Sequence, residues 1–362
     1  MKISKLYSNN DNFKTIEFDN GINFILSDTN GVGKSSLFKL IDFCLLGDKH
    51  FLGNEHFKDY IFYIELQIAA NRYITIKRPV TNGKNIELKI TKEKSLLLDE
   101  KDFNIKGSLG IAKSFFENKV NYSINKFRTY ITYFLRDESN QNDVFILNKH
   151  TTLHEIEYKT VVSNLVGIDG RKIRRKYELD EIIKKEGIDT TTLKNAQSDL
   201  EKVIEENKTL ISSRFIDRLK YSVAKYGRII LGKEVTFLID LNSSNDIEFS
   251  INVKNDENSN DNLNDEATIK KLLCLIFASA LAETYAQKRL IKFVAFDSPF
   301  DGDKNSYEDG IYSAIHQLNK IGIQTIITSN ENAIHNPKIL LEIKNEYMTD
   351  YFSDKDKLMG DF

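Results

Sequence analysis

The 362-residue sequence predicts an α/β fold with a parallel sheet, a separate antiparallel β lobe and a helical insertion between two halves of the chain. Three observations lead to this prediction. A glycine-rich loop at 28–36 lies between a β-like run and a helix-like run. A hydrophobic run at 290–297 ends in a carboxylate, as a buried parallel strand does when it delivers an acid at its C-terminal end. Between them, residues 171–225 are rich in charge, and their apolar residues recur at steps of three and four.

The composition is that of a globular protein, with 41% hydrophobic and 29% charged residues. A formal net charge of −2 gives no global argument for nucleic acid or an anionic membrane, so any DNA contact needs a local patch. Cys44 and Cys274 lie in apolar helical runs and indicate packed thiols rather than a disulfide or a metal site. Because we find neither a secretory signal nor a membrane-spanning apolar run, we expect a cytoplasmic protein without a membrane partner.

The loop at 28–36 has the pattern of a phosphate-binding loop. Its glycines allow backbone N–H groups to close around phosphates, Lys34 reaches the phosphate oxygens, and the Ser35 hydroxyl ligates Mg²⁺. Asp28 stands where glycine is usual, and we expect it to tolerate left-handed backbone geometry while its carboxylate lowers phosphate affinity. The alternative is a glycine-rich turn before an ordinary helix. The expected binding residues are Asp28, Asn30, Gly31, Val32, Gly33, Lys34, Ser35 and Ser36.

The rest of the N-terminal part predicts strands followed by helices. The run 13–18 places the apolar residues Phe13, Ile16 and Phe18 among polar ones and predicts a half-buried strand. Further strand-like runs, separated by turn signals, predict an antiparallel lobe at 60–66, 72–78 and 86–90. From about 108 to 166 the pattern is helical, including the aromatic run 126–136.

Residues 171–225 predict an antiparallel helical hairpin. Asp189 or a neighbouring threonine can cap its second helix, and the first arm, up to 186, is about 24 Å long at 1.5 Å per residue. Asn207 would be a polar core position that fixes the register. An open alternative is a pair of amphipathic helices folded onto the core. Consecutive a and d positions fall on Leu193, Ala196, Leu200, Val203, Asn207 and Leu210.

The C-terminal part predicts strands at 235–240 and 247–253, a polar mobile loop at 254–266 and a long apolar helix at 267–287. The strand ending at Asp297, a helix at about 305–321 and a strand at 323–328 then imply a parallel sheet. Asp297 has the position of a Walker B acid.

A phosphate loop near the start of the chain and a Walker B acid after a helical insertion make an order that resembles the split ATPase head of the SMC, RecN and RecF superfamily of ABC-type ATPases. The resemblance implies that N- and C-terminal halves fold into one head while the insertion projects as a short coiled coil. It places the N-terminal half at 1–170, the insertion at 171–225 and the C-terminal half at 226–362.

Short tracts give a narrower resemblance to the SMC-like ATPases of bacterial Lamassu-type anti-phage and anti-plasmid systems. They are 6–10, 13–18, 21–23, 41–45, 133–136 and 296–302. This resemblance implies a homodimer of heads that uses ATP and Mg²⁺, senses DNA ends or unusual DNA structures, and controls a nuclease and accessory subunits.

The resemblance also implies roles for single residues. Lys34 would bind phosphate, Ser35 would ligate the metal, and Asp297 would hold it through water. Ser298 stands where a glutamate usually orients the attacking water, so hydrolysis should be slow unless another acid serves. Asp301, returned by a turn through Pro299, is the nearest acid and Asp303 the next; alternatively, both only form a turn and cap the next helix.

Three other positions depart from the family pattern. Asn330 stands at the place of the switch-loop histidine, where it can hydrogen-bond phosphate without changing charge. Arg136 stands at the Q-loop and either contacts nucleotide or a partner head, or is an exposed surface residue. The signature loop falls at 264–268 and is degenerate, which weakens the case for ATP-driven dimerisation. The basic cluster 171–176 either grips DNA phosphates or is a solvated helix face.

The leading interpretation is therefore a cytoplasmic SMC-like ATPase subunit that binds Mg-ATP in a DNA-sensing defence complex. One alternative is a RecN- or RecF-like DNA-repair ATPase with turnover stimulated by DNA. Another is a non-hydrolysing scaffold held together by nucleotide. Ser298 and the degenerate signature loop favour a switch or scaffold over a fast motor.

Overall fold

The computed structural model describes most of the chain and contains two large sheets. The described residues are 1–47, 57–81, 85–94, 102–103, 105–120, 124–147, 155–185, 189–210, 213–254, 266–286, 291–301, 307–353 and 357–358, with backbone alone for 116–120, 124–127, 129 and 210. The strands are β1 (Lys2–Ser8), β2 (Ile16–Glu17), β3 (Ile22–Ser27), β4 (Ile61–Ala69), β5 (Arg72–Pro79), β6 (Asn85–Thr91), β7 (Ile105–Ser108), β8 (Leu135–Arg136), β9 (Val235–Leu241), β10 (Ile247–Val253), β11 (Phe293–Asp297), β12 (Gln324–Asn330) and β13 (Met348–Phe352). The α-helices are α1 (Lys34–Cys44), α2 (Leu109–Val120), α3 (Ile124–Phe134), α4 (Glu155–Leu165), α5 (Gly170–Lys184), α6 (Thr190–Leu210), α7 (Arg214–Leu231), α8 (Glu266–Ala286), α9 (Glu308–Lys320) and α10 (Pro337–Glu342).

The parallel sheet joins the two ends of the chain. Its order is β13-β3-β12-β11-β8, and each neighbouring pair is parallel. Its central strands β3, β12 and β11 are almost wholly buried because helices cover them, which explains their continuous apolar runs. The register pairs Asp297 with Thr328 and Ser27 with Asn330, so the C-terminal ends of β3, β11 and β12 lie at one edge. The predicted parallel sheet is confirmed.

The second sheet is the predicted antiparallel lobe, with the order β2-β1-β4-β5-β6-β7. Two local predictions are wrong. The strand expected at 13–18 forms only at Ile16–Glu17, where it pairs with β1. The helix expected through 126–136 ends at Phe134, because Leu135 and Arg136 pair with β11 at the edge of the parallel sheet.

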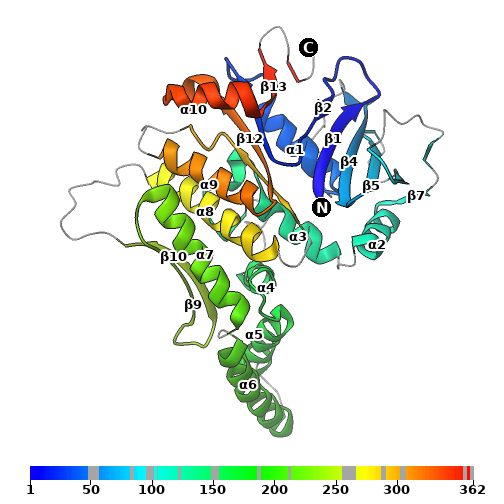
Figure 1. The fold of residues 1–362 in the computed structure, drawn as a ribbon. Coiled ribbons are helices and arrows are strands. Elements are labelled where there is room, and N and C mark those ends of the chain that lie inside the picture. Colours follow the sequence, from blue (N-terminus) through cyan, green and yellow to red (C-terminus); the bar gives the residue numbers. More distant parts are fainter. Residues whose placement is uncertain are drawn as a thin grey trace.

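α8 lies inside the head and is apolar on nearly every side. Its residues from Leu272 to Ala282 are all buried, because α7, α9 and the parallel sheet surround it. Figure 1 shows α7, α8 and α9 side by side on the head. Although α8 is apolar, none of the helices that the structure describes has the combination of length and hydropathy needed to cross a membrane.

The arm consists of α5 and α6, which pack along each other and project away from the two sheets (Figure 1). Ala196 and Asn207 are buried in it, and Leu193, Leu200 and Val203 are half-buried, which agrees with the predicted a and d positions. The alternative of two amphipathic helices folded onto the core is therefore wrong for α5 and α6. α7 instead packs on α8 and α9 in the head, so the boundary predicted at 225 falls inside a head helix.

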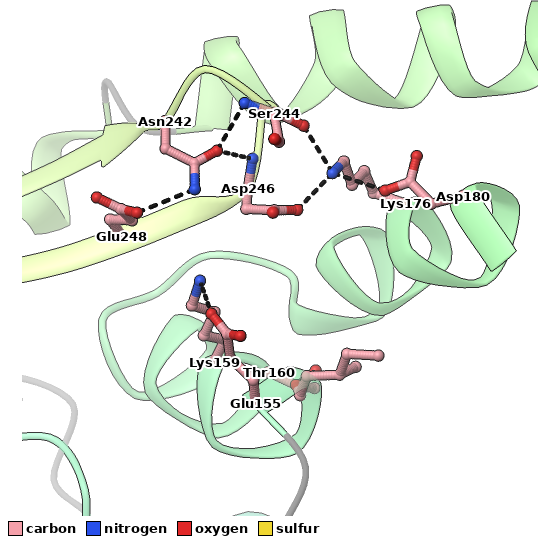
Figure 2. A network of polar contacts seen from close by, with 10 residues as sticks. Glu155, Lys159, Thr160, Lys176, Asp180, Asn242, Ser244, Asp246 and Glu248 are labelled. Atoms are coloured by element: carbon pink, nitrogen blue, oxygen red, sulfur yellow. Dashed lines mark hydrogen bonds and ion pairs between the residues drawn. The ribbon is translucent and has the colours of Figure 1, made fainter. Parts of the chain in front are cut away.

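A buried lysine fixes the arm to the head at the arm's root (Figure 2). Lys176 of α5 is 3% exposed, and its Nζ donates to Ser244 O at 2.8 Å and forms ion pairs with Asp180 at 2.7 Å and with Asp246. The β9–β10 turn that supplies two of these groups is held by Asn242, whose Oδ1 accepts from the backbone N–H groups of Ser244 and Asp246. Burial lowers the pKa of Lys176, but the two carboxylates outweigh it and the net shift is upward.

Candidate functional site

The phosphate-type loop lies between β3 and α1, at the C-terminal edge of the parallel sheet. Gly31 and Gly33 have φ of 84° and 105°, in the left-handed region that glycine adopts without strain. A Cβ on Gly33 would also lie 2.8 Å from the Cβ of Leu358. Gly33 caps α1 without a side-chain hydrogen bond, so the first N–H groups of the helix can take an anion. The loop thus has the backbone form that the sequence predicts.

Asp28 does not need the left-handed geometry that we expected of it. Among the described residues other than glycine, positive φ occurs only at Leu46, Asn71, Asn245 and Ser298. The first loop position therefore accepts a side chain. Within the described part of the chain, Asp28 Oδ1 is buried without a hydrogen-bond partner.

Lys34 is the buried cation of the site, with 7% of its surface exposed. Its Nζ donates to Ser27 Oγ and, at 3.1 Å, to the carbonyl of Thr29. Burial lowers the pKa of Lys34, and the carboxylates of Asp301, Asp297 and Asp28 act in the opposite direction. The structure thus brings acids from both ends of the chain to one lysine.

The other loop residues differ in exposure. Ser35 and Ser36 are half-buried in the first turn of α1, and Asn30 is exposed. Val32 is buried, and its carbonyl accepts from Leu358 N at 3.2 Å. Ser35 and Ser36 are therefore placed where a phosphate or metal ligand is expected, while Val32 has a packing role.

Asp297 ends β11 and is 1% exposed. Its Oδ1 accepts from Thr328 Oγ1 at 2.6 Å, whereas its Oδ2 is buried and has no partner among the described residues. Leaving a buried carboxylate oxygen unpaired is costly unless a ligand satisfies it. This orphaned oxygen, the Ser35 hydroxyl and the Lys34 ammonium fit Mg²⁺ with a phosphorylated nucleotide, because Mg²⁺ takes oxygen ligands and retains several waters. No group of three or more His, Cys, Asp or Glu in the described ranges could hold a metal.

The chain turns back sharply after Asp297. Ser298 has φ of 49°, which is unusual for a residue with a side chain; its N–H donates to Thr328 O at 2.9 Å and its carbonyl accepts from Asp301 N at 3.1 Å. Partial burial raises the pKa of Asp301, while the charges of Lys271 and Lys34 oppose this. The turn thus returns Asp301 toward the phosphate-type loop. Asp301 does not cap α9, because its N-cap is Tyr307 and has no side-chain cap bond; Asp303 lies outside the described residues.

Asn330 lies beside the phosphate-type loop, at the end of β12. Its register partner is Ser27 of β3. Its Oδ1 accepts from Asn332 N at 2.9 Å and starts a short 3-10 turn, and Asn332 Nδ2 donates to Asp28 O at 3.4 Å. Asn330 is therefore in the right place for a phosphate contact, although its side-chain oxygen is already used.

The comparisons with known proteins agree with this geometry. The head domain of Smc with a coiled coil and joint from Pyrococcus yayanosii is similar with a TM-score of 0.52 and 12% identity, over 92% of this chain and 93% of that chain. The Smc head domain from Pyrococcus furiosus, bound to the C-terminal domain of ScpA, has a TM-score of 0.50 and 16% identity, over 92% and 90%. The chain has the fold of an SMC head. A scan against protein-family models and a search of curated proteins gave no match.

In this SMC-like head, Arg136 is not where we expected a nucleotide or surface contact. It is 0% exposed, and its guanidinium donates to the carbonyls of Asn140 at 2.8 Å, Asp143 at 3.2 Å and Val144 at 2.7 Å. Because the side chain is fully buried, the exposed-surface alternative is wrong. The guanidinium holds the loop after β8 together and does not face the phosphate-type loop.

Gln141, which the sequence analysis missed, is the residue of this loop that reaches the site. Its Nε2 donates to Asp297 O at 2.9 Å and to Arg136 O at 3.1 Å. The available signal was a glutamine shortly after an aromatic helix, but its role depended on where that helix ended. Gln141 holds the backbone of the Walker B position from one side.

Lys271 of α8 was also missed. Its Nζ donates to Ser298 O and, at 3.1 Å, to Asp301 O. The available signal was a lysine directly before the long apolar stretch of α8, because a cation that such a stretch partly buries needs a partner. Of the expected signature loop, Glu266–Thr268 begin α8, and 264–265 lie outside the described residues.

The basic cluster at the root of the arm is largely neutralised within the chain. Three of its exposed or half-buried cations have carboxylate partners: Arg171 with Asp169 at 2.8 Å, Lys172 with Glu206 at 2.5 Å, and Arg175 with Glu178 at 3.5 Å. Lys176 is buried in the root contact described above. This pairing favours the solvated helix face over a preformed phosphate grip.

Proposed function

We propose that this chain is an ATP-binding, slowly hydrolysing SMC-like ATPase subunit. The observation that carries the proposal is the convergence of Lys34, Asp297 and Asp301 at one edge of the parallel sheet, although the chain between them makes the rest of the head and the arm. Unpaired buried oxygens beside a buried lysine favour a ligand that supplies both a metal and phosphates.

In this proposal, positively charged and N–H groups bind the phosphates, and oxygen-bearing side chains bind the metal. Lys34 exchanges its contacts with Ser27 and Thr29 for phosphate oxygens, and the amides of the glycine loop take the same anion. Ser35 and Asp297 would hold Mg²⁺, and the unpaired Oδ2 of Asp297 is free for this role among the described residues. When bound, Mg²⁺ supplies positive charge that neutralises the phosphates. The Thr328 hydroxyl orients Asp297 by donating a hydrogen bond to its Oδ1.

Asp301 is the acid that orients the attacking water. The Ser298 hydroxyl cannot accept a proton usefully at neutral pH, whereas Asp301 faces Lys34 from the same turn. Its raised pKa moves the carboxylate toward the range where a general base works best. Asp301→Asn should therefore lower turnover about 100-fold, with ATP affinity little changed. Equal turnover in Asp301→Asn and the wild type would remove Asp301 from this role.

We further propose that the subunit works in the cytoplasm as a dimer of heads in a bacterial DNA-sensing defence complex that controls an associated nuclease. The short sequence tracts that resemble those of Lamassu-type ATPases support this. The Pyrococcus furiosus head was solved with a domain of ScpA, and we infer accessory subunits for this chain by analogy. The test is ATP turnover by the purified chain with linear and with closed circular DNA, with co-purifying proteins retained. Stimulation by linear but not by closed circular DNA supports the sensor, and identical rates with and without DNA contradict it.

A non-hydrolysing scaffold is the second candidate, and Ser298 at the position after Asp297 favours it. Tight ATP binding without turnover under any of these conditions would establish the scaffold in place of the enzyme. Turnover stimulated by every form of DNA, linear and circular alike, would instead favour a RecN- or RecF-like repair ATPase.

A further inference from the structure

A lysine from α8 holds the turn that carries Asp301. Lys271 Nζ donates to the carbonyls of Ser298 and Asp301, which are the first and last residues of that turn. Its two bonds therefore join the ends of the turn to a helix that comes before it in sequence. Both acceptors are backbone carbonyls, so the lysine fixes the path of the backbone through the turn.

The turn needs such support because its backbone is strained. Ser298 has φ of 49°, a conformation that persists in a residue with a side chain only where the surroundings impose it. Thr328 O accepts from Ser298 N, and Gln141 Nε2 donates to Asp297 O. Lys271 adds a further contact to the turn and lies next to a small cavity that it lines with Gln141, Cys274, Phe296 and Pro299.

The surroundings of Lys271 shift its pKa downward overall. Burial lowers its pKa, and Asp301 and Asp297 oppose that shift. Lys34 and Lys271 thus face Asp301 from different elements, α1 and α8. Lys34 Nζ donates to the phosphate-type loop, whereas Lys271 Nζ donates to the two ends of the turn.

We propose that Lys271 is a positioning residue for ATP hydrolysis, which fixes the Ser298–Asp301 turn so that Asp301 faces the phosphate-type loop. The inference rests on the proposed function and deepens it. It also connects the start of α8, where the degenerate signature loop ends, to the acid of the site. Because Lys271 acts on the turn in this role, its loss should reduce catalysis and leave nucleotide binding intact.

Lys270 offers a matched control. It is the neighbouring residue, and its side chain is 50% exposed and pairs with Glu266 on the same helix at 2.6 Å. Lys270→Met removes the same charge from the same turn of α8 without touching the Asp301 turn. Lys271→Arg keeps the charge and a donor.

The experiment compares wild type, Lys271→Met, Lys271→Arg and Lys270→Met as full chains. Steady-state ATP hydrolysis gives kcat and KM, and fluorescence titration with N-methylanthraniloyl-ATP gives Kd. We expect Lys271→Met to lower kcat at least about tenfold, with KM and Kd within about threefold of wild type. Lys271→Arg should recover most of kcat, and Lys270→Met should match wild type. Thermal melting of each variant checks that it folds, and Lys271→Gln replaces the Met variant if that one does not.

The outcomes separate the two proposals. If wild type neither binds nor hydrolyses ATP, the proposed function fails. If wild type hydrolyses ATP and Lys271→Met behaves like Lys270→Met, the positioning role is overturned. It is also overturned if Lys271→Met loses affinity as much as kcat, or if Lys271→Arg is as slow as Lys271→Met.

Discussion

Two buried lysines, Lys34 in the proposed nucleotide site and Lys176 at the root of the arm, have opposite surroundings. Lys176 has two carboxylates and a carbonyl as partners, and its pKa is raised. Lys34 has a hydroxyl and a carbonyl within hydrogen-bond reach, and its pKa is lowered. In the same site, buried oxygens of Asp28 and Asp297 have no hydrogen-bond partner among the residues that the structure describes. A satisfied cation fastens two parts of a fold together, whereas an under-satisfied one is prepared for a ligand.

The largest effect should come from removing the prepared lysine. Lys34→Ala should lower ATP turnover by about 100-fold or more, because the phosphates lose a preorganised positive charge. Its free energy of unfolding should change little, since a desolvated charge is removed together with its contacts. Lys39→Ala is the matched control, because Lys39 is exposed on the same helix. Steady-state hydrolysis and urea unfolding measure both effects, and a Lys34→Ala variant with wild-type turnover would contradict the comparison.

Removing the satisfied lysine should affect stability instead. Lys176→Met leaves Asp180 and Asp246 without their shared cation, and we expect the free energy of unfolding to fall by about 2 kcal/mol, discounted because both carboxylates are partly exposed. Lys172→Met breaks only an exposed pair with Glu206 and should cost less than about 0.5 kcal/mol. Urea unfolding of Lys176→Met and Lys172→Met measures the two losses of stability. Equal stability losses would mean that Lys176 is not a fastening point.

The smallest effect is a difference in how stability depends on pH. The folded-state pKa of Lys34 is below the ordinary value of 10.5, so in the range just below pH 10.5 the unfolded chain binds more protons and stability rises with pH. The folded-state pKa of Lys176 is above 10.5, so its contribution is complete below that value and is lost as pH rises beyond it. Urea unfolding from pH 9 to 11.5 should show that Lys34→Ala flattens the rise and Lys176→Met flattens the fall. The same change in both variants would contradict the opposite signs.

Much of the fold could be predicted because its signals are local. The glycine–lysine–serine loop between a strand and a helix, and the apolar run ending at Asp297, each carry their pattern within a few residues. The parallel sheet follows from strands that alternate with a crossover helix. The heptad positions of α6 also agreed with the observed burial, because periodicity reports directly on which face is covered.

The parts that failed depend on contacts between distant residues. Arg136 follows the helical pattern of α3, but pairing with β11 ends the helix before it and turns the guanidinium onto the carbonyls of its own loop. Gln141 and Lys271 gain their roles only when the loop after β8 and the helix α8 both pack against the end of β11. α7 has an amphipathic pattern that suits either an arm or a head helix, and packing on α8 decides it. Local sequence does not contain that information.

The most direct test of the account is the Mg²⁺ dependence of ATP binding by the full chain, in wild type and in Asp297→Asn. Isothermal titration of ATP with and without Mg²⁺ measures it. The account predicts that Mg²⁺ tightens ATP binding in wild type and that Asp297→Asn loses most of this gain, because the unpaired Oδ2 of Asp297 is a metal-holding atom. ATP binding that ignores Mg²⁺ in wild type, or a gain that survives in Asp297→Asn, would contradict a nucleotide site built from the two ends of the chain.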